Sequence, residues 1–123
     1  MSTIKVDTIK DTNNVEVYTC KAWVNFNGSG TVAINASGNV SSITDNGTGD
    51  YTINFTNAMD DANYCFTACN KAGTDSASRF TTVMVQGNNT PTTTSLRILH
   101  GISLYGTDNY FKDSTIINVA VFR

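Results

Sequence analysis

The chain has 123 residues, a length that fits one domain. Its 8 basic and 10 acidic residues form no basic stripe, so we expect no nucleic-acid binding. No apolar run approaches the roughly 20 residues of a membrane-spanning helix, so we expect no membrane insertion.

Thr, Asn, Ser and Gly dominate the composition, whereas Glu, Lys and Leu are scarce and Pro91 is the single proline. Thr favours strands, and Asn and Gly favour turns. Short apolar-alternating stretches recur at intervals of roughly 8–12 residues, which is typical of sandwiches, jelly rolls and small barrels. The sequence therefore predicts an all-β fold, an antiparallel β-sandwich or jelly-roll-like domain.

The first predicted element, residues 2–10, alternates polar and apolar side chains, as a half-buried strand or an extended arm does. We predict an N-terminal arm over residues 1–14, with attachment or subunit contacts at Ile4, Val6 and Ile9. A turn follows at residues 11–14. The segment lacks the apolar stretch of a signal peptide, so we expect synthesis in a cytoplasm, with any export by another route such as lysis.

The remaining residues, 15–123, are predicted to form the single β-sandwich domain. Trp23 and Val24 are adjacent, so the first strand carries apolar groups on both faces and suits a sandwich core or a subunit contact. Residues 56–62 have room for one helical turn. The predicted strands are residues 15–27, 31–36, 40–44, 51–56, 62–70, 79–86, 96–104 and 115–122.

The stretch SSITDNGTGDYTINF, residues 41–55, concentrates turn-forming residues between two strand patterns. A calcium loop starting at Asp45 would need side-chain oxygens where Gly47 and Gly49 stand. A phosphate-binding glycine loop would lead into a helix, but a strand pattern follows. We therefore predict a hairpin, in which Asn46-Gly47 is the favoured pair for a two-residue turn and the second glycine, Gly49, allows a bulge or a longer loop.

Three cysteines, Cys20, Cys65 and Cys69, form an odd set, which is unusual for a disulfide scaffold. On a strand, Cys65 and Cys69 would share a face about 13 Å apart, too far to bridge. Together with His100 their spacing is weak for zinc, and we expect them to be small buried hydrophobic residues. The chain shows no nucleophile elbow and no facing carboxylate pair, so we expect no enzyme, no metal and no cofactor.

A binding surface fits this sequence better than an active site does, and binding residues are often found on loops that a rigid β scaffold presents. Two polar loops, residues 87–94 and 105–114, offer aromatic and amide groups that can stack on sugars and hydrogen-bond their hydroxyls. The alternative is that the aromatic residues of the second loop cover the end of the core. The candidate receptor-binding residues are Asn88, Asn89, Tyr105, Asp108, Asn109 and Tyr110, with Phe111 beside them.

Two stretches carry a resemblance to known proteins. STIKVDTIKDT at the start resembles the leader of tail-fibre-like virion proteins of marine and cyanobacterial phages. KAWVNFNGSGTVAI and NVSSITDNGTGDYTINFTNAMDDANY resemble a domain that recurs in the same class, often at the end of tail fibres. The resemblance covers residues 2–64. Asp60 stands where that class often has proline, so this turn is expected to be looser.

The resemblance implies a virion protein that is a homotrimer and is attached to other virion proteins of the tail or baseplate through its N-terminal part. We expect a short tail fibre or fibre tip that contacts the host surface, with a surface glycan as one candidate receptor. The alternatives are a head decoration or cement protein and a fragment of a polysaccharide depolymerase.

Overall fold

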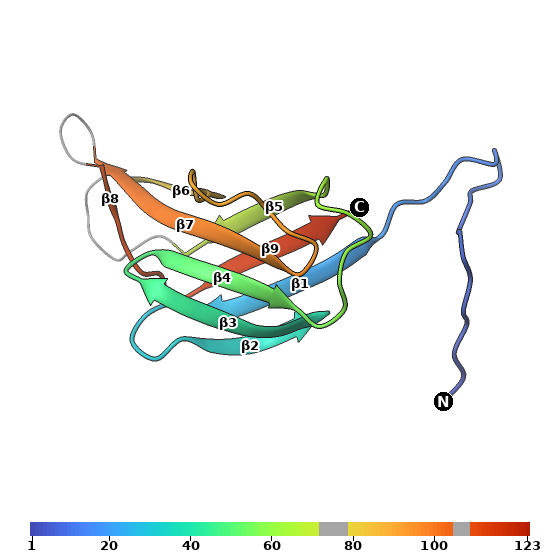
Figure 1. The fold of residues 1–123 in the computed structure, drawn as a ribbon, viewed down its shortest axis with the longest axis horizontal. Coiled ribbons are helices and arrows are strands. Elements are labelled where there is room, and N and C mark those ends of the chain that lie inside the picture. The colour runs from blue at the N-terminus through green and yellow to red at the C-terminus, as the bar shows by residue number, and fades with distance from the viewer. Residues whose placement is uncertain (72–78, 105–108) are drawn as a thin grey trace.

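A computed structural model describes residues 1–71, 79–104 and 109–123, which form nine strands and contain no helix (Figure 1). Accordingly, no helix in these ranges could cross a membrane. The predicted all-β class is confirmed, and residues 56–62, which had room for one helical turn, contain none. The strands are β1 (Cys20–Asn27), β2 (Ala33–Gly38), β3 (Val40–Gly47), β4 (Asp50–Phe55), β5 (Cys65–Asn70), β6 (Arg79–Val85), β7 (Ser95–Leu104), β8 (Asn109–Phe111) and β9 (Ile117–Phe122).

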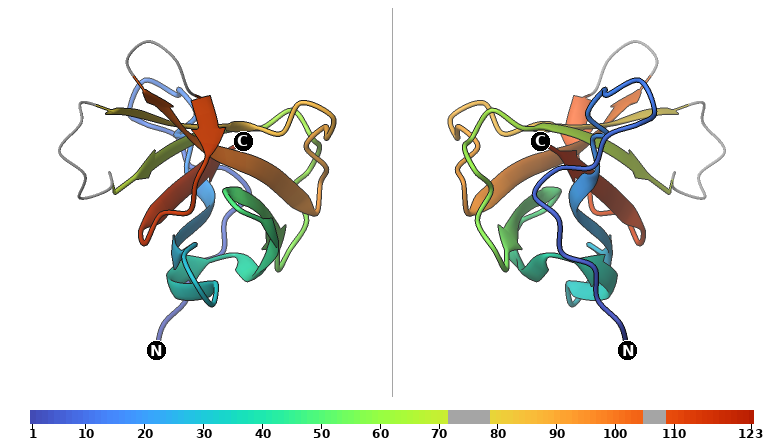
Figure 2. Two further views of the ribbon diagram at one scale, coloured as in Figure 1. Left: turned by 90° about the vertical axis from the view of Figure 1, so that its left-hand side faces the viewer. Right: turned by 90° about the vertical axis from the view of Figure 1, so that its right-hand side faces the viewer.

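The strands form two antiparallel sheets that pack face to face as a β-sandwich (Figure 2). One sheet has the order β2-β1-β9-β5, and the other has the order β3-β4-β7-β6. Strand β8 also pairs with β7, at residues 101–103, beyond the part of β7 that β4 covers. The central strands of the first sheet, β1 and β9, come from opposite ends of the domain, so the fold closes only when the C-terminal strand joins.

Alternation of apolar and polar residues decides which side of each strand enters the core. In β4, Tyr51, Ile53 and Phe55 are buried, whereas the residues between them are half-buried on the outer face. β9 alternates in the same way, with Ile117, Val119 and Val121 inward. The core also takes buried side chains from β1 and β7: Ala22, Val24, Phe26, Leu96 and Ile98.

A single residue, Asn39, carries the chain from the first sheet to the second, between β2 and β3. Its φ is 55°, a value that Asn tolerates better than most residues. The side-chain Nδ2 of Asn39 donates to the carbonyl oxygens of Lys21 and Asn57, at 3.0 and 3.1 Å. Its Oδ1 accepts from the backbone amide of Asn57 at 2.8 Å. The corner between the sheets is therefore held to β1 of the first sheet and to the segment that follows β4.

Several strand boundaries differ from the prediction. β1 begins at Cys20, so residues 15–19 belong to the arm and not to a strand. β2 runs on to Gly38, through part of the predicted break at residues 37–39. β8 lies inside the stretch predicted as a loop, residues 105–114, because its backbone pairs with the end of β7. Pairing of this kind depends on a strand remote in the chain, which local composition does not indicate.

The predicted hairpin over residues 41–55 is present, but its turn is not Asn46-Gly47. Gly47 pairs with Asp50, so Thr48 and Gly49 form the turn and Asn46 lies in a bulge. Gly49 has φ +64°, and a Cβ there would collide with the carbonyl oxygen of His100. The amide of His100 in turn donates to the carbonyl oxygen of Gly49 at 2.7 Å. Contact with β7 thus places the turn, against the local preference for Asn-Gly.

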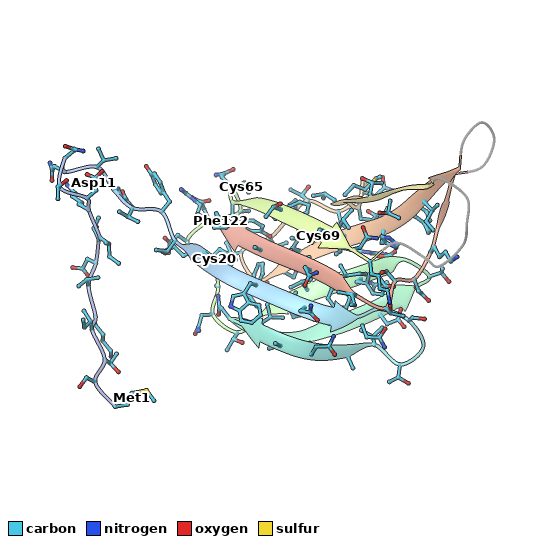
Figure 3. The ribbon with its side chains drawn as sticks, turned by 180° about the vertical axis from the view of Figure 1, so that it is seen from behind. Met1, Asp11, Cys20, Cys65, Cys69 and Phe122 are labelled. Carbon is cyan, nitrogen blue, oxygen red and sulfur yellow. The ribbon has the colours of Figure 1, made fainter. Side chains whose placement is uncertain are left out.

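The expectation that the cysteines are buried is wrong, because all three are free and exposed. Cys65 and Cys69 do share one face of β5, as predicted, but it is the outer face. Phe66 and Ala68, the residues of β5 packed against the core, set that alternation. Cys20 and Cys65 pair with Phe122 from opposite sides and so stand two strands apart, about 10 Å, too far for a disulfide (Figure 3).

Candidate functional site: the N-terminal arm and the outer face of one sheet

The arm, residues 1–19, leaves the sandwich next to the C-terminus and extends away from it (Figures 1 and 3). Its predicted contact residues are open to solvent, with exposed fractions of 88% for Ile4, 58% for Val6 and 51% for Ile9. Val15, Val17 and Tyr18 are exposed as well. The arm therefore places a series of apolar side chains outside the core of its own domain.

The turn predicted at residues 11–14 is present and folds part of the arm into a small hairpin. The amide of Val17 donates to the carbonyl oxygen of Ile9, and the amide of Asp11 to that of Val15, both at 2.8 Å. Asn14 has φ 65°, and Oδ1 of Asp11 accepts from the amide of Val15 at 3.0 Å. Residues 1–8 make no backbone hydrogen bond within the described chain.

Those of the predicted receptor-binding residues that the structure describes do not lie together. Asn88 and Asn89 are exposed in the loop between β6 and β7, beyond the start of β7. β8, which contains Asn109 and Tyr110, pairs near the other end of β7. Tyr105 and Asp108 lie outside the described residues. A ligand reaching both Asn88 and β8 would have to span most of the ten-residue strand β7, about 30 Å.

The loop with Asn88 and Asn89 also uses some of its polar groups in hydrogen bonds within the loop. Oε1 of Gln86 accepts from the amide of Asn88 at 2.8 Å and from Nδ2 of Asn89 at 2.9 Å. The side chain of Asn89 therefore shapes the loop. This leaves the Asn88 side chain as the amide group of the pair without a hydrogen bond in the described structure.

His100 is buried in the core at the junction of β7 and the segment after β8, and its Nδ1 lies within hydrogen-bond distance of the carbonyl oxygen of Lys112. That nitrogen carries the proton, because a carbonyl can only accept. Its Nε2 is buried without a partner in the described residues. No group of three or more His, Cys, Asp or Glu side chains with metal-binding spacing occurs in these residues.

A groove on the outer face of the β2-β1-β9-β5 sheet was not predicted as a site. It has a volume of about 530 Å³ and crosses all four strands. We call it the Trp23 groove after the residue with the largest side chain in it. Its outward side chains are those of Trp23, Asn25, Ala36, Thr67, Asn118 and Ala120, with Cys69 at the β5 end.

Trp23 forms one wall of the groove. Its indole lies over Gly38 of β2, where a Cβ would come within 2.9 Å of the indole Cδ1. On the other side its backbone pairs with Ala120, which pairs with Thr67. Both are small, so a hollow remains beside the indole. The Trp23 side chain is consequently held in place and yet 44% exposed.

A row of amides forms the second feature: Asn25 and Asn118 line the groove, and Asn35 extends the row beyond it on β2. Nδ2 of Asn35 donates to Oδ1 of Asn25 at 2.8 Å, and Nδ2 of Asn25 donates to Oδ1 of Asn118 at 2.6 Å. Nδ2 of Asn118 reaches the sulfur of Cys69 at 3.6 Å. Each amide nitrogen has two hydrogens and uses one in this row. One N–H of each Asn is therefore available to a ligand.

The outer face of the other sheet is different in kind. Its central feature is an ion pair in which Nε and Nη2 of Arg97 donate to Asp50, at 2.8 and 2.7 Å. Nδ2 of Asn54 donates to the hydroxyls of Ser42 and Thr44, at 3.1 and 3.0 Å. The polar groups on this outer face are thus hydrogen-bonded to one another. The outer face of the first sheet instead combines an exposed aromatic ring with unused amide donors.

Sequence reasoning found one part of this groove and missed the rest. The adjacency of Trp23 and Val24 indicated that both faces of β1 carry apolar groups, and Trp23 is indeed on the outer face. Asn25 and Asn118 are 93 residues apart, and only the pairing of β1 with β9 makes them neighbours.

Comparisons of this chain with protein-family models, curated proteins and solved structures found no match.

Proposed function

We propose that this chain is a non-enzymatic structural protein of a phage particle, a short tail fibre or fibre tip that contacts the host surface. In this proposal the N-terminal arms join three copies to one another where the trimer attaches to the particle, and the β-sandwich points outward. The observation that carries it is the arm with its exposed apolar side chains. The likeness of residues 2–64 to tail-fibre-like proteins points the same way.

Holding the arm in one conformation is unfavourable in an isolated chain. Fixing the backbone of one residue costs about 1–2 kcal/mol, and little within the arm offsets that cost. Burying an Ile or Val side chain on a partner contributes about 1.5–3 kcal/mol. Ile4, Val6 and Ile9 can therefore offset part of the ordering cost only when a second surface covers them.

The backbone of the arm supports the same conclusion. Residues 1–8 are extended, and their N–H and C=O groups have no partner in the described chain. A segment of this kind can add as a strand to the edge of a neighbouring sheet. Each sheet of the sandwich offers edges, at β2 and β5 in the first and at β3 and β6 in the second.

Light scattering on the purified protein tests the arm. We expect a trimer for the unmodified chain and smaller species for the triple variant Ile4→Ser/Val6→Ser/Ile9→Ser. The matched control is Lys5→Ser/Asp7→Ser, which changes the intervening polar residues of the arm and should leave the trimer intact. A monomeric unmodified chain, or a triple variant that stays trimeric, would contradict the proposal.

Location on the particle separates this proposal from its alternatives. Antibody raised against residues 20–123 and detected by electron microscopy should label the tail of purified particles. Label over the head would favour a decoration protein. Release of reducing sugar from host envelope material by the purified protein would favour a depolymerase.

A further inference from the structure

We propose that the Trp23 groove is a binding site for a neutral glycan, with a sugar ring stacked on Trp23 and its hydroxyls bonded by the amides of Asn25 and Asn118. The inference rests on the proposed function for its setting, a sandwich that faces the host surface. Its physical content does not depend on that setting, because the groove belongs to the isolated domain.

The exposed indole is a suitable platform for a sugar. The faces of an aromatic ring carry partial negative charge, and the C–H groups on one side of a pyranose carry partial positive charge. Gly38 supports the Trp23 ring from the β2 side, so stacking needs little reorganisation of the side chain. Ala120 and Thr67, the next residues across the sheet, leave the space that a ring would fill.

The row of amides can orient a bound sugar, because its N–H donors lie at fixed positions. Asn35, Asn25 and Asn118 follow one another across strands that are about 4.8 Å apart, and each has an unused N–H. Sugar hydroxyls can accept from these donors and can donate to the unbonded Oδ1 of Asn35. Mainly apolar lining with a few directed polar groups is the usual composition of a small-molecule site.

The charge of the groove selects the class of glycan. All the residues that line it are uncharged. A carboxylated or sulfated sugar would lose water in the groove and gain no cation in return. The expected ligand is therefore a neutral hexose or pentose oligosaccharide.

Two protein occupants fit the groove less well. A second copy related by two-fold symmetry would present the same hollow, so the two concave faces would leave a void between them. The side chains on the apolar face of an arm, Ile4 and Val6, offer no acceptor to the free amide N–H groups, so only the backbone carbonyls of the arm could satisfy them. A glycan, by contrast, offers an apolar ring face to Trp23 and hydroxyls to the amides at once.

The fluorescence of Trp23 gives a direct test, because it is the single tryptophan of the chain. The intact protein is titrated with cellohexaose, xylohexaose, mannohexaose and, for comparison, oligogalacturonate of the same length. We expect a saturable change in Trp23 emission with at least one neutral probe and none with the charged one. Bound glycan should also slow the reaction of Cys69 with a thiol reagent.

Three variants locate the site. Ala120→Leu fills the hollow while keeping the indole and the amides, and Asn118→Ala removes one donor; each should weaken binding by about tenfold or more, a change equivalent to about 1.4 kcal/mol. Phe111→Ala, which removes a comparably exposed aromatic ring from β8, should leave affinity within about twofold. Thermal unfolding confirms that each variant folds.

Several results would overturn the inference: no response to any neutral probe at millimolar concentration, binding of the charged probe alone, or binding that Phe111→Ala removes. Displacement of the glycan by a peptide of residues 1–14, or a groove covered in the oligomer, would show that the chain itself occupies the site. Failure of glycan binding with an intact arm-dependent trimer overturns this inference alone. Loss of the trimer prediction with glycan binding intact overturns the proposed assembly alone.

Discussion

The indole of Trp23 lies over Gly38, its cross-strand partner in β2, so closely that a single added methyl group would enter the ring. Gly38→Ala should therefore displace the indole and destabilise the fold by about 1–3 kcal/mol, as overpacking does. Chemical denaturation and the Trp23 emission maximum measure the two effects. Gly87→Ala is the control, because a Cβ there meets nothing within 4 Å. Equal behaviour of the two variants would mean that the indole is not held against Gly38.

Substitutions at Gly49 and Gly30 distinguish the cost of a strained backbone from the cost of a collision between an added Cβ and its surroundings. Their φ angles are similar, +64° and +67°, but only at Gly49 would a Cβ collide with its surroundings, the backbone of His100 and Lys112. Gly30→Ala should cost about 1–2 kcal/mol, the penalty of the left-handed conformation. Gly49→Ala should cost clearly more and lower the thermal midpoint further. Equal costs would show that the turn moves away from β7 without penalty.

Tyr51 joins three segments through its hydroxyl. The oxygen lies 2.7 Å from Oδ1 of Asp113 and 2.8 Å from the carbonyl oxygen of Gly28, and its one proton can be donated to either. Burial, and then the hydrogen bond to Asp113, raises the pKa of Tyr51 well above its usual value. Tyr51→Phe keeps the edge-to-face contact with Phe26 and should destabilise the fold by about 1.5–3 kcal/mol, as for a bond to a charged group.

The control for that variant is Tyr64→Phe. The Tyr64 hydroxyl bonds to carbonyl oxygens of Thr92 and Ser95, both at 3.0 Å, and its ring packs edge-on against Phe55. Because both acceptors are neutral, this change should cost only about 0.5–1.5 kcal/mol. Urea denaturation at pH 7 compares the two. A Tyr64→Phe cost as large as that of Tyr51→Phe would argue against a special role for Asp113.

Acid should weaken the outer face of the β3-β4-β7-β6 sheet. The hydrogen bonds from Arg97 hold the pKa of Asp50 below its usual value of 3.8. Because this pKa is lower in the folded than in the unfolded chain, its contribution is present above pH 3.8 and is lost as the pH falls below that value. Asp50→Asn should therefore reduce stability at pH 7 by about 1 kcal/mol or less and flatten the decline below pH 4.

Asp61→Asn is the matched control for Asp50→Asn. Hydrogen bonds from Arg123 also lower the pKa of Asp61, but the side chains of that pair are 38% and 42% exposed, against 18% and 31% for Asp50 and Arg97. Solvent screens the more exposed pair more strongly, so its loss should change acid stability less. Stability measured between pH 2 and pH 7 checks the order, and the reverse order would contradict it.

Local pattern alone was enough for the fold class and for much of the strand layout. In the sequence Ile53 and Phe55 alternate with Thr52 and Asn54, and this period of two indicates which side chains of β4 are buried, because successive residues of a strand face opposite sides. The turn at residues 11–14 and the hairpin around Gly47 were also predictable, because Asn, Asp and Gly favour turns through their own backbone and side-chain preferences.

Tertiary contact decided what local preference could not. The hairpin turns at Thr48-Gly49 because Gly49 packs against the backbone of His100, a contact between residues far apart in the chain. The same limit applies to the candidate site. A sequence shows that Asn25 and Asn118 exist, but pairing of β1 with β9 makes them a row, and the absence of a side chain on Gly38 gives Trp23 its place. Which residues become neighbours is a property of the closed sheets, because strand pairing is chosen by packing of the whole core.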